Sequence, residues 1–436
     1  MKARLALVLA ATLGLAACQG DDTDPAQTAP MAAATQENLL TLVSNTGLNR
    51  SQQARLAFLR ERSSNAETHV ARLAGSPGRL LAKGSAVRLS VAPGVDVVAL
   101  GERVESRADN DVSWAGPLRG GFGWVQMVLS GGDVTATVTV GQAQYSIEPL
   151  GNGLHAVSRI DQNKFPPEHT ADNPTGALDP SPPADFLKAM AAKGGNGGGG
   201  TDPGTGTETG GIQAVSTINV LVVYTASAAS AAGNITSKIQ LAVDETNQSY
   251  VNSGISINMV RVHTAQVTYT ESGKTFSQHV AALRSTTDGI MDNVHTLRNT
   301  YGADMVILVV NDTEACGIAS SIGSTATTAF AVADQSCITG YYSFGHELGH
   351  LQGARHDRFV DSSTSPYAYG HGFIPSSKNW RTVMAYGNNC ANCQRIQWWS
   401  NPLKTYPSTG QVMGTAAYED NARVLNLTAP TVALYR

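Results

Sequence analysis

The chain has 436 residues, which is long enough for two or three domains with substantial cores. Charged residues make up only 15% of it and the formal net charge is -4, so the composition does not support a nucleic-acid partner. The 44 glycines and the aromatic content of 6% are typical of a loop-rich, extracytoplasmic protein.

Residues 1–17 have the features of an export signal: two basic residues precede an apolar run, residues 5–15, that is too short to span a bilayer. The signal ends in the letters LAAC, which resemble a bacterial lipobox with Cys18 as the lipid-modified N-terminus of the mature chain. Gln19 fits sorting to an outer membrane, by resemblance to other bacterial lipoproteins. We therefore expect an exported outer-membrane or cell-surface lipoprotein, bound to the membrane only through the lipid at Cys18. Ordinary signal cleavage beside an incidental cysteine is the alternative.

A flexible tether and a first domain follow. Residues 18–35 are rich in Asp, Thr, Ala and Pro, as flexible tethers are. Residues 36–190 form the first domain, which is predicted to begin with an amphipathic helix over residues 37–62, broken near Gly47, and to continue as a small β-rich fold. Alternating apolar residues and glycine-containing turns predict strands at residues 87–91, 125–129 and 134–140.

Residues 191–212 are a Gly-rich linker whose open backbone favours proteolysis. The second domain, residues 213–436, alternates apolar strands with helices. We predict strands at residues 218–225, 255–262 and 304–310 and helices at residues 234–250 and 280–300. This order predicts an α/β (α+β) domain with a mixed, mostly parallel sheet and two backing helices. Residues 330–333 are expected to form the edge strand, where an extended substrate could pair.

The sequence HELGHLQGARH has the spacing H-E-x-x-H-x-x-G-x-x-H. On a helix, His346 and His350 project from one face, so both can bind one metal ion. Gly353 allows the chain to turn, and His356 can then return as a third ligand. Three neutral nitrogen ligands with one open position indicate a single catalytic Zn²⁺. Glu347 is placed to take a proton from a water molecule at the metal.

The zinc motif and the segment VMAY at residues 383–386 together resemble the metzincin metalloproteases. The resemblance implies a metzincin zinc-protease domain with an active-site helix, in which Met384 is an apolar floor beneath the three histidines. Tyr386 stands where the astacin and serralysin families have a tyrosine that can stabilise an oxyanion, although it could simply be a packed aromatic residue. Asp357 matches the reprolysin (adamalysin) families, where this aspartate supports the fold.

Within this clan the chain resembles the bacterial peptidyl-Asp metalloendopeptidases. The segments that carry the resemblance are the zinc motif, VLVVYT at 220–225, YGAD at 301–304, CGIA at 316–319, WRTVMAY at 380–386 and WSNP at 399–402. The resemblance implies a propeptide and cleavage on the amino side of aspartate, less readily glutamate. An acidic side chain in the substrate pocket needs a cation, and Arg381 and Arg395 are the candidates, with Lys378 behind them. The alternative for each is an ordinary surface charge, which is the commoner role of such residues.

Four cysteines lie in the second domain, and in an exported chain two disulfides are the default. Of the three pairings that are open, we expect Cys316 with Cys337 and Cys390 with Cys393, because these are nearest in sequence. The C-x-x-C spacing of the second pair would also suit a redox site or half of a zinc site.

An exported β-rich domain, a cleavable linker and a protease motif together predict a proenzyme. Many metzincins block their zinc with a propeptide cysteine, but residues 36–315 contain none. Latency would need Asp161, Glu168 or His169 as the ligand, or simple steric plugging. A permanent accessory domain is the alternative to a propeptide.

We therefore predict a zinc-dependent endopeptidase that hydrolyses protein or peptide substrates with a metal-activated water and acts as a monomer. Linker cleavage would release a secreted mature protease. A broad-specificity reprolysin-like protease is one alternative, and a catalytically weak, zinc-containing cell-surface binding protein is another. The presence of Glu347 argues against the second. Asp- and Asn-rich loops would allow a calcium site, but no EF-hand-type spacing supports one.

Overall fold

The computed structural model describes residues 37–108, 111–170, 173, 175–194, 214–391 and 393–436. The predicted export signal, Cys18, the tether and nearly all of the predicted linker lie outside these residues. Within the described ranges, no helix is both long enough and apolar enough to span a bilayer.

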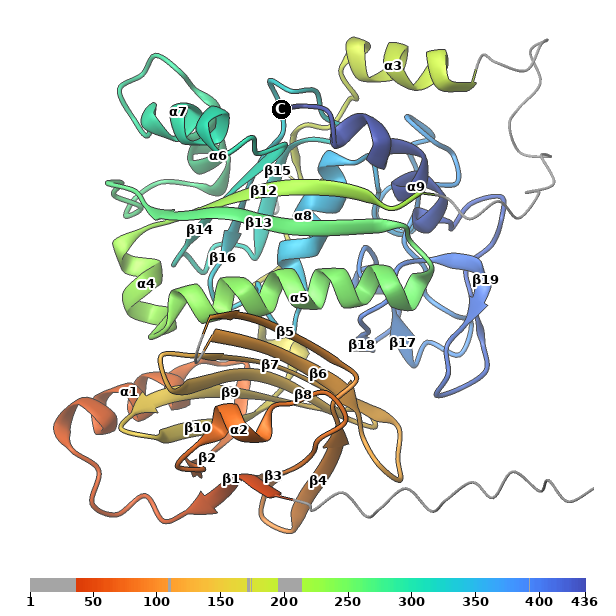
Figure 1. Cartoon of the computed structure of the whole chain (residues 1–436). Coiled ribbons are helices and arrows are strands. Elements are labelled where there is room, and N and C mark those ends of the chain that lie inside the picture. Colours follow the sequence, from red (N-terminus) through yellow and green to blue (C-terminus); the bar gives the residue numbers. More distant parts are fainter. Residues whose placement is uncertain (1–36, 109–110, 171–172, 174, 195–213, 392) are drawn as a thin grey trace, which may run out of the picture. The chain divides into compact units, whose positions relative to one another are not determined.

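The described residues before the linker form a ten-stranded sheet in the order β4-β3-β1-β2-β10-β9-β8-β7-β6-β5 (Figure 1). Its side chains make a core rich in Val and Leu, because alternate residues of each strand face one side. The short turn at Gly131-Gly132 has positive φ at both positions, which favours glycine. The elements are β1 (Glu37–Val43), α1 (Arg50–Glu61), β2 (Asn65–Leu73), α2 (Pro77–Leu80), β3 (Ala86–Ala92), β4 (Val95–Leu100), β5 (Arg103–Ala108), β6 (Asp111–Pro117), β7 (Gly123–Ser130), β8 (Asp133–Val140), β9 (Ala143–Gly151) and β10 (Leu154–Ile160).

The prediction of a helix at the start of this domain is wrong for its first part. Residues 37–43 form β1, which pairs antiparallel with β2 and parallel with β3. The helix α1 begins only after Asn49, whose side chain forms a capping box with Gln52. A short apolar run fits a buried strand as well as a helix, so periodicity alone misassigned it.

The second domain contains a six-stranded sheet in the order β11-β15-β16-β14-β12-β13. Neighbouring strands are parallel except for the antiparallel pair β15–β16, so the sheet is mixed and mostly parallel, as predicted. The central strands are continuous runs of buried Val, Ile and Leu, typical of a sheet covered on both faces. The strands are β11 (Ala177–Asp179), β12 (Ser216–Tyr224), β13 (Ile257–Gln266), β14 (Met305–Val310), β15 (Gly317–Ser321) and β16 (Phe330–Asp334).

Helices cover both faces of this sheet. The long helix α5 lies along one face, where it shares a core with α8 and α9 (Figure 1). The opposite face is covered by α6 and α7. The remaining elements are α3 (Ala184–Gly194), α4 (Ala226–Ala232), α5 (Ile235–Ser253), α6 (Phe276–Arg284), α7 (Asn293–Thr300), α8 (Ser343–Leu351), α9 (Asn421–Val432), two 3-10 turns (Gln162–Lys164 and Gly387–Asn389) and the short strands β17 (Trp380–Arg381), β18 (Gln394–Arg395), β19 (Asn401–Thr405) and β20 (Val412–Met413).

Two predictions for this domain are wrong. The expected single helix over residues 280–300 is divided into α6 and α7, because the intervening turn contains Asp288, which accepts a hydrogen bond from Ile290 N, and Gly289 at positive φ. The expected edge strand at residues 330–333 is β16, which lies between β14 and β15. The strand outside it, β15, has the sequence GIASS, whose short run of small residues gives no strand signal.

The first domain contributes to the second sheet and packs on its helices. Residues 177–179 form β11, which pairs parallel with β15 at the margin of the sheet. Arg55 and Arg62 both donate to the carbonyl of Ala231 at the C-terminal end of α4, and Gln126 donates to the carbonyl of Asp244 in α5. The disulfides join Cys316 to Cys337 and Cys390 to Cys393, the pairing expected from the sequence.

Candidate active site

The helix α8 and the turn after it carry the zinc motif. His346, Glu347 and His350 are buried on α8, and the chain leaves the helix through Gly353 at a φ of 100°. His356 then returns to the same point as the first two histidines. The sequence predicted this turn from the glycine, because a positive φ favours a residue without Cβ.

The three histidines meet through their Nε2 atoms. His356 Nε2 lies 3.2 Å from His346 Nε2 and 2.9 Å from His350 Nε2. The Nδ1 atoms of His346 and His350 face the carbonyls of Val383 and Ala354, at 3.0 and 2.9 Å. A carbonyl only accepts, so each Nδ1 carries the proton and each Nε2 directs a lone pair to the common point.

This arrangement fits a metal ion. Nitrogen ligands at ~2.0–2.1 Å from a tetrahedral zinc ion would be separated by roughly 3.3 Å, close to the observed spacing. Burial lowers the pKa of His350 to about 3, and holds the pKa values of His346 and His356 well below the usual range. The imidazoles are therefore neutral near pH 7, the state that binds metal.

Glu347 is a buried carboxylate with unused hydrogen-bonding capacity. Neither of its oxygens has a hydrogen-bond partner among the described residues. Burial, reinforced by the charge of Glu168, raises its pKa well above the usual range. An alanine Cβ at Gly317 would lie 2.6 Å from Glu347 Cδ, so the small residue on β15 leaves space for this side chain. A buried carboxyl beside three metal-type ligands suits a proton acceptor and donor.

The predicted supporting residues lie around the histidines. Met384 is completely buried in the core shared with α8. The Asp357 carboxylate accepts a hydrogen bond from Tyr386 N at 2.8 Å, which ties the third histidine to the segment after Met384. The ring of Tyr386 lies 4.4 Å from that of His356, and its hydroxyl has no partner among the described residues. Burial raises the pKa of Tyr386 well above its usual range, so its hydroxyl keeps its proton and can donate.

A fourth histidine, from the first domain, joins the cluster. His169 Nε2 lies 3.1 Å from His356 Nε2, and its Nδ1 lies 2.7 Å from the carbonyl of Gly317. His169, His346, His350 and His356 form one group whose ring nitrogens could hold a metal ion. Burial lowers the pKa of His169 to about 4. Of the three latency residues proposed from the sequence, His169 and Glu168 reach the site, whereas Asp161 caps a 3-10 turn through Asn163 N.

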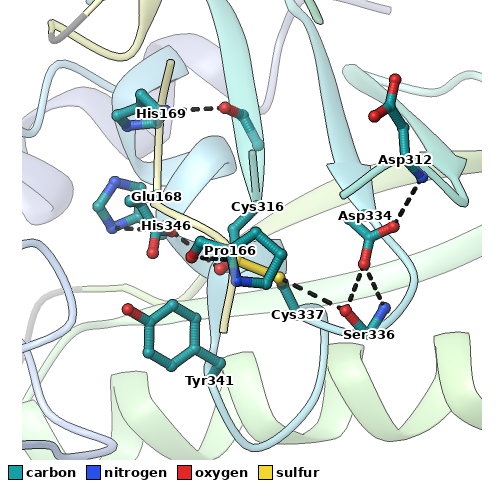
Figure 2. Close-up of a disulfide and its surroundings, with 12 residues drawn as sticks. Pro166, Glu168, His169, Asp312, Cys316, Asp334, Ser336, Cys337, Tyr341 and His346 are labelled. Carbon is teal, nitrogen blue, oxygen red and sulfur yellow. Dashed lines mark hydrogen bonds and ion pairs between the residues drawn. A yellow bond between two sulfur atoms is a disulfide. The ribbon is translucent and has the colours of Figure 1, made fainter. Parts of the chain in front are cut away.

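Figure 2 shows Glu168 and His169 beside His346, next to the disulfide between Cys316 and Cys337. The Glu168 carboxylate is buried and lies 2.7 Å from Arg395 Nη1. Its other oxygen accepts from the Ser343 hydroxyl at 2.8 Å and lies 3.8 Å from His346 Nδ1. Neither Ser343 nor the partnership between Glu168 and Arg395 had a signal in the sequence.

The two candidate pocket arginines have different surroundings. Both are buried, so neither is an ordinary surface charge. Arg381 donates to the carbonyls of Ala385 and Cys393 and to the Tyr341 hydroxyl, which ties together its own loop. Arg395 instead faces an acidic side chain, and its Nε has no partner among the described residues. The geometry therefore favours Arg395 as the cation that meets an acidic group.

The similarity of this sequence to a known protein family also indicates a metallopeptidase. A family model described as metallo-peptidase family M12 matches residues 214–400. The mixed α/β domain, the histidine cluster and this match define a metalloendopeptidase, which hydrolyses protein or peptide substrates and binds a metal ion.

Named relatives show the family to which this chain belongs. The chain is 40% identical over 362 residues to the peptidyl-Asp metalloendopeptidase of Stenotrophomonas maltophilia (strain R551-3), covering 79% of this chain and 81% of the relative. It is 41% identical over 339 residues to the protein of the same name from Xanthomonas campestris pv. campestris, covering 77% and 74%. A Pseudomonas fragi relative is 43% identical over 194 residues, 44% of this chain and 100% of the relative. The chain belongs to the peptidyl-Asp metalloendopeptidase family, as the sequence motifs predicted.

Proposed function

We propose that this chain is a zinc-dependent endopeptidase of the metzincin type. His346, His350 and His356 would hold the zinc ion, and the observation that carries this assignment is the convergence of their Nε2 atoms at 2.9 and 3.2 Å. The bound zinc ion would polarise the scissile carbonyl and activate a water molecule for attack. Met384 is a buried floor for the cluster, and the Asp357 contact to Tyr386 N positions the segment that contains it.

Two residues would handle charge and protons during hydrolysis. Glu347 accepts a proton from the attacking water and delivers it to the leaving amine, a role supported by its partnerless oxygens beside the histidines. Tyr386 directs its hydroxyl at the carbonyl oxygen as negative charge develops there. The short distance between the rings of Tyr386 and His356 supports this role.

We propose cleavage on the amino side of aspartate, and less readily glutamate. The names of the relatives specify peptidyl-Asp activity. Independent support comes from Arg395, a buried guanidinium whose Nη1 lies 2.7 Å from the Glu168 carboxylate, close to His346. A planar guanidinium binds a carboxylate strongly in a buried pocket, whereas a neutral substrate side chain would leave it unpaired.

The chain would be made as an exported proenzyme. Residues 36–190 are the propeptide, with His169 beside the three motif histidines as support for a blocked site. We propose that Cys18 is lipidated and holds the proenzyme at the outer membrane or cell surface, and that cleavage within residues 191–212 releases an active, monomeric domain.

Digestion of a denatured protein by the linker-cleaved enzyme, followed by sequencing of the new N-termini, tests the function. Cuts before Asp support the proposal, scattered cuts support a broad reprolysin-like protease, and no cleavage supports a zinc-containing binding protein. Metal analysis of the same sample should give one zinc ion per chain. A Glu347→Gln variant that digests as fast as the parent would refute the proposed mechanism.

A further inference from the structure

A segment of the first domain occupies the margin of the catalytic sheet. The carbonyls of Pro167 and Glu168 accept hydrogen bonds from Cys316 N and Gly317 N at 2.8 and 3.0 Å. Further along, the carbonyl of Gly176 accepts from Ala319 N at 2.9 Å, and the chain continues as β11. The free backbone groups of β15, where an extended peptide could pair, are therefore taken by this chain's own residues.

His169 stands beside the three motif histidines, where it can supply a fourth nitrogen ligand. Its Nε2 lies 3.1 Å from His356 Nε2, close to the 3.2 and 2.9 Å that separate His356 Nε2 from those of His346 and His350. Its Nδ1 faces the Gly317 carbonyl, so its Nε2 carries the lone pair. A Cβ at Gly176 would lie 2.6 Å from Cδ2 of the His169 ring and nearer still to its Nε2, so the glycine allows close packing against the ring. Four neutral imidazoles leave no position for water or substrate, which is a closed site.

The neighbouring Glu168 provides the acidic group for the pocket. Its carboxylate would be costly to bury alone, but Arg395 and Ser343 compensate it at 2.7 and 2.8 Å. Arg395 in turn depends on Glu168: without that carboxylate, the buried guanidinium keeps, among the described residues, one hydrogen-bond acceptor, the carbonyl of Tyr341 at 3.0 Å. Such a cation favours another carboxylate in the same place.

We propose that Glu168-His169 is a built-in substrate mimic, in which His169 is the fourth metal ligand and Glu168 fills the Asp-recognising pocket on Arg395. This inference rests on the proposed function and adds its regulation. The same arginine thus both selects acidic substrates and holds the inhibitory segment. Latency and specificity should therefore change together when Arg395 is altered.

The ten-stranded sheet is held on the second domain by contacts other than those of Glu168 and His169. Glu148, which pairs with Arg55 and Arg62 at 2.9 and 2.7 Å, lies 3.7 Å from Lys238 of α5, and both arginines donate to α4. Changes at Glu168 or His169 should therefore open the site without releasing the whole domain. Glu67, whose side chain is 52% exposed and pairs with His69, offers a matched control.

The metal contact is tested on the full chain, stripped of metal and reloaded with Co²⁺. We expect the visible absorption of a four-nitrogen tetrahedral site in the parent and in Glu67→Gln. In His169→Ala and in the milder His169→Asn, the spectrum should change as one nitrogen is lost, while one Co²⁺ per chain remains bound. An unchanged spectrum in a folded His169 variant would overturn the assignment of the fourth ligand.

The pocket contact is tested with two short peptides that differ only by Asp or Ala after the scissile bond. In the uncut full chain, Glu168→Gln should raise hydrolysis of the Asp peptide at least about tenfold, because a charge-assisted buried contact is lost. The Glu67→Gln control should not. Adding Arg395→Gln to Glu168→Gln should reduce cleavage of the Asp peptide at least about tenfold relative to the Ala peptide.

No activation by Glu168→Gln, or an unchanged ratio between the two peptides in the double variant, would overturn the mimicry. A different outcome would refute the proposed endopeptidase function. If His169→Ala binds Co²⁺ with an altered spectrum but cuts neither peptide, the fourth-ligand assignment stands and the endopeptidase assignment falls.

Discussion

Replacing Gly317 with alanine tests the placement of Glu347 without touching a charged or metal-type residue. A Cβ there would lie 2.6 Å from both Cγ and Cδ of Glu347. These carbon atoms must retreat by about 0.4 Å to reach 3.0 Å and by about 0.8 Å to reach the 3.4 Å of ordinary contact, and Oε1, which would lie nearer still, must retreat further. Gly317 is not at positive φ, so alanine adds no backbone strain.

A misplacement of this size at a proton-transferring group costs roughly 10- to 100-fold in rate, or about 1.4–2.7 kcal/mol of transition-state stabilisation. We therefore expect kcat on an Asp peptide, measured after linker cleavage, to fall by about that factor while zinc content and KM change little. Gly387→Ala is the matched control, because its Cβ would make only an ordinary 3.7 Å contact with Arg381. Unchanged kcat in Gly317→Ala would refute the reasoning, and loss of zinc would show that the strand, not the carboxylate, had been disturbed.

Other predictions follow from the same contacts. Glu347→Gln should lower kcat at least about 10³-fold with zinc retained, as metal analysis and kinetics can show. A chelator should abolish hydrolysis and lower Tm, and added zinc should restore both. Arg381→Ala should lower the unfolding free energy by about 1–3 kcal/mol and reduce cleavage of Asp and Ala peptides equally, because this arginine ties its own loop. Burial opposes ionisation of Glu148, but the charges of Arg62, Lys238 and Arg55 outweigh it and lower its pKa from 4.5 to about 2. A depressed acid pKa stabilises the fold above pH 4.5, so Tm should fall between pH 4.5 and about 2, and less steeply in Glu148→Gln.

The sequence predicted those parts of the molecule that depend on local spacing. His346, Glu347 and His350 are set by one helix turn, and the chain reversal at Gly353 by one glycine. The continuous apolar runs of β12 and β14 identified buried strands for the same reason. Physical information carried within about ten residues was sufficient for all of these.

The features that the sequence did not predict depend on contacts between residues that are far apart along the chain. Glu168 and Arg395 are 227 positions apart, and nothing in either neighbourhood marks them as partners. The strand β15 was missed because its small residues carry no strand signal, and its Gly317 instead leaves space for Glu347. Tertiary contacts override propensity in such segments. Both failures lie at the contact between the first domain and the catalytic site.

In the proposed proenzyme, linker cleavage would not by itself displace residues 167–169, because the contacts that hold them lie outside residues 191–212; release of the active domain would also require their displacement. The carbonyls of Pro167 and Glu168 would remain bonded to Cys316 N and Gly317 N, and the Glu168 carboxylate would remain on Arg395. What cleavage removes is the covalent connection, and with it the high effective concentration of the segment at the site. An acidic substrate would then compete for the same strand edge, the same guanidinium and the same metal position. Activation should therefore proceed by exchange of one carboxylate for another on Arg395, and neutral peptides should displace the segment less effectively than acidic ones.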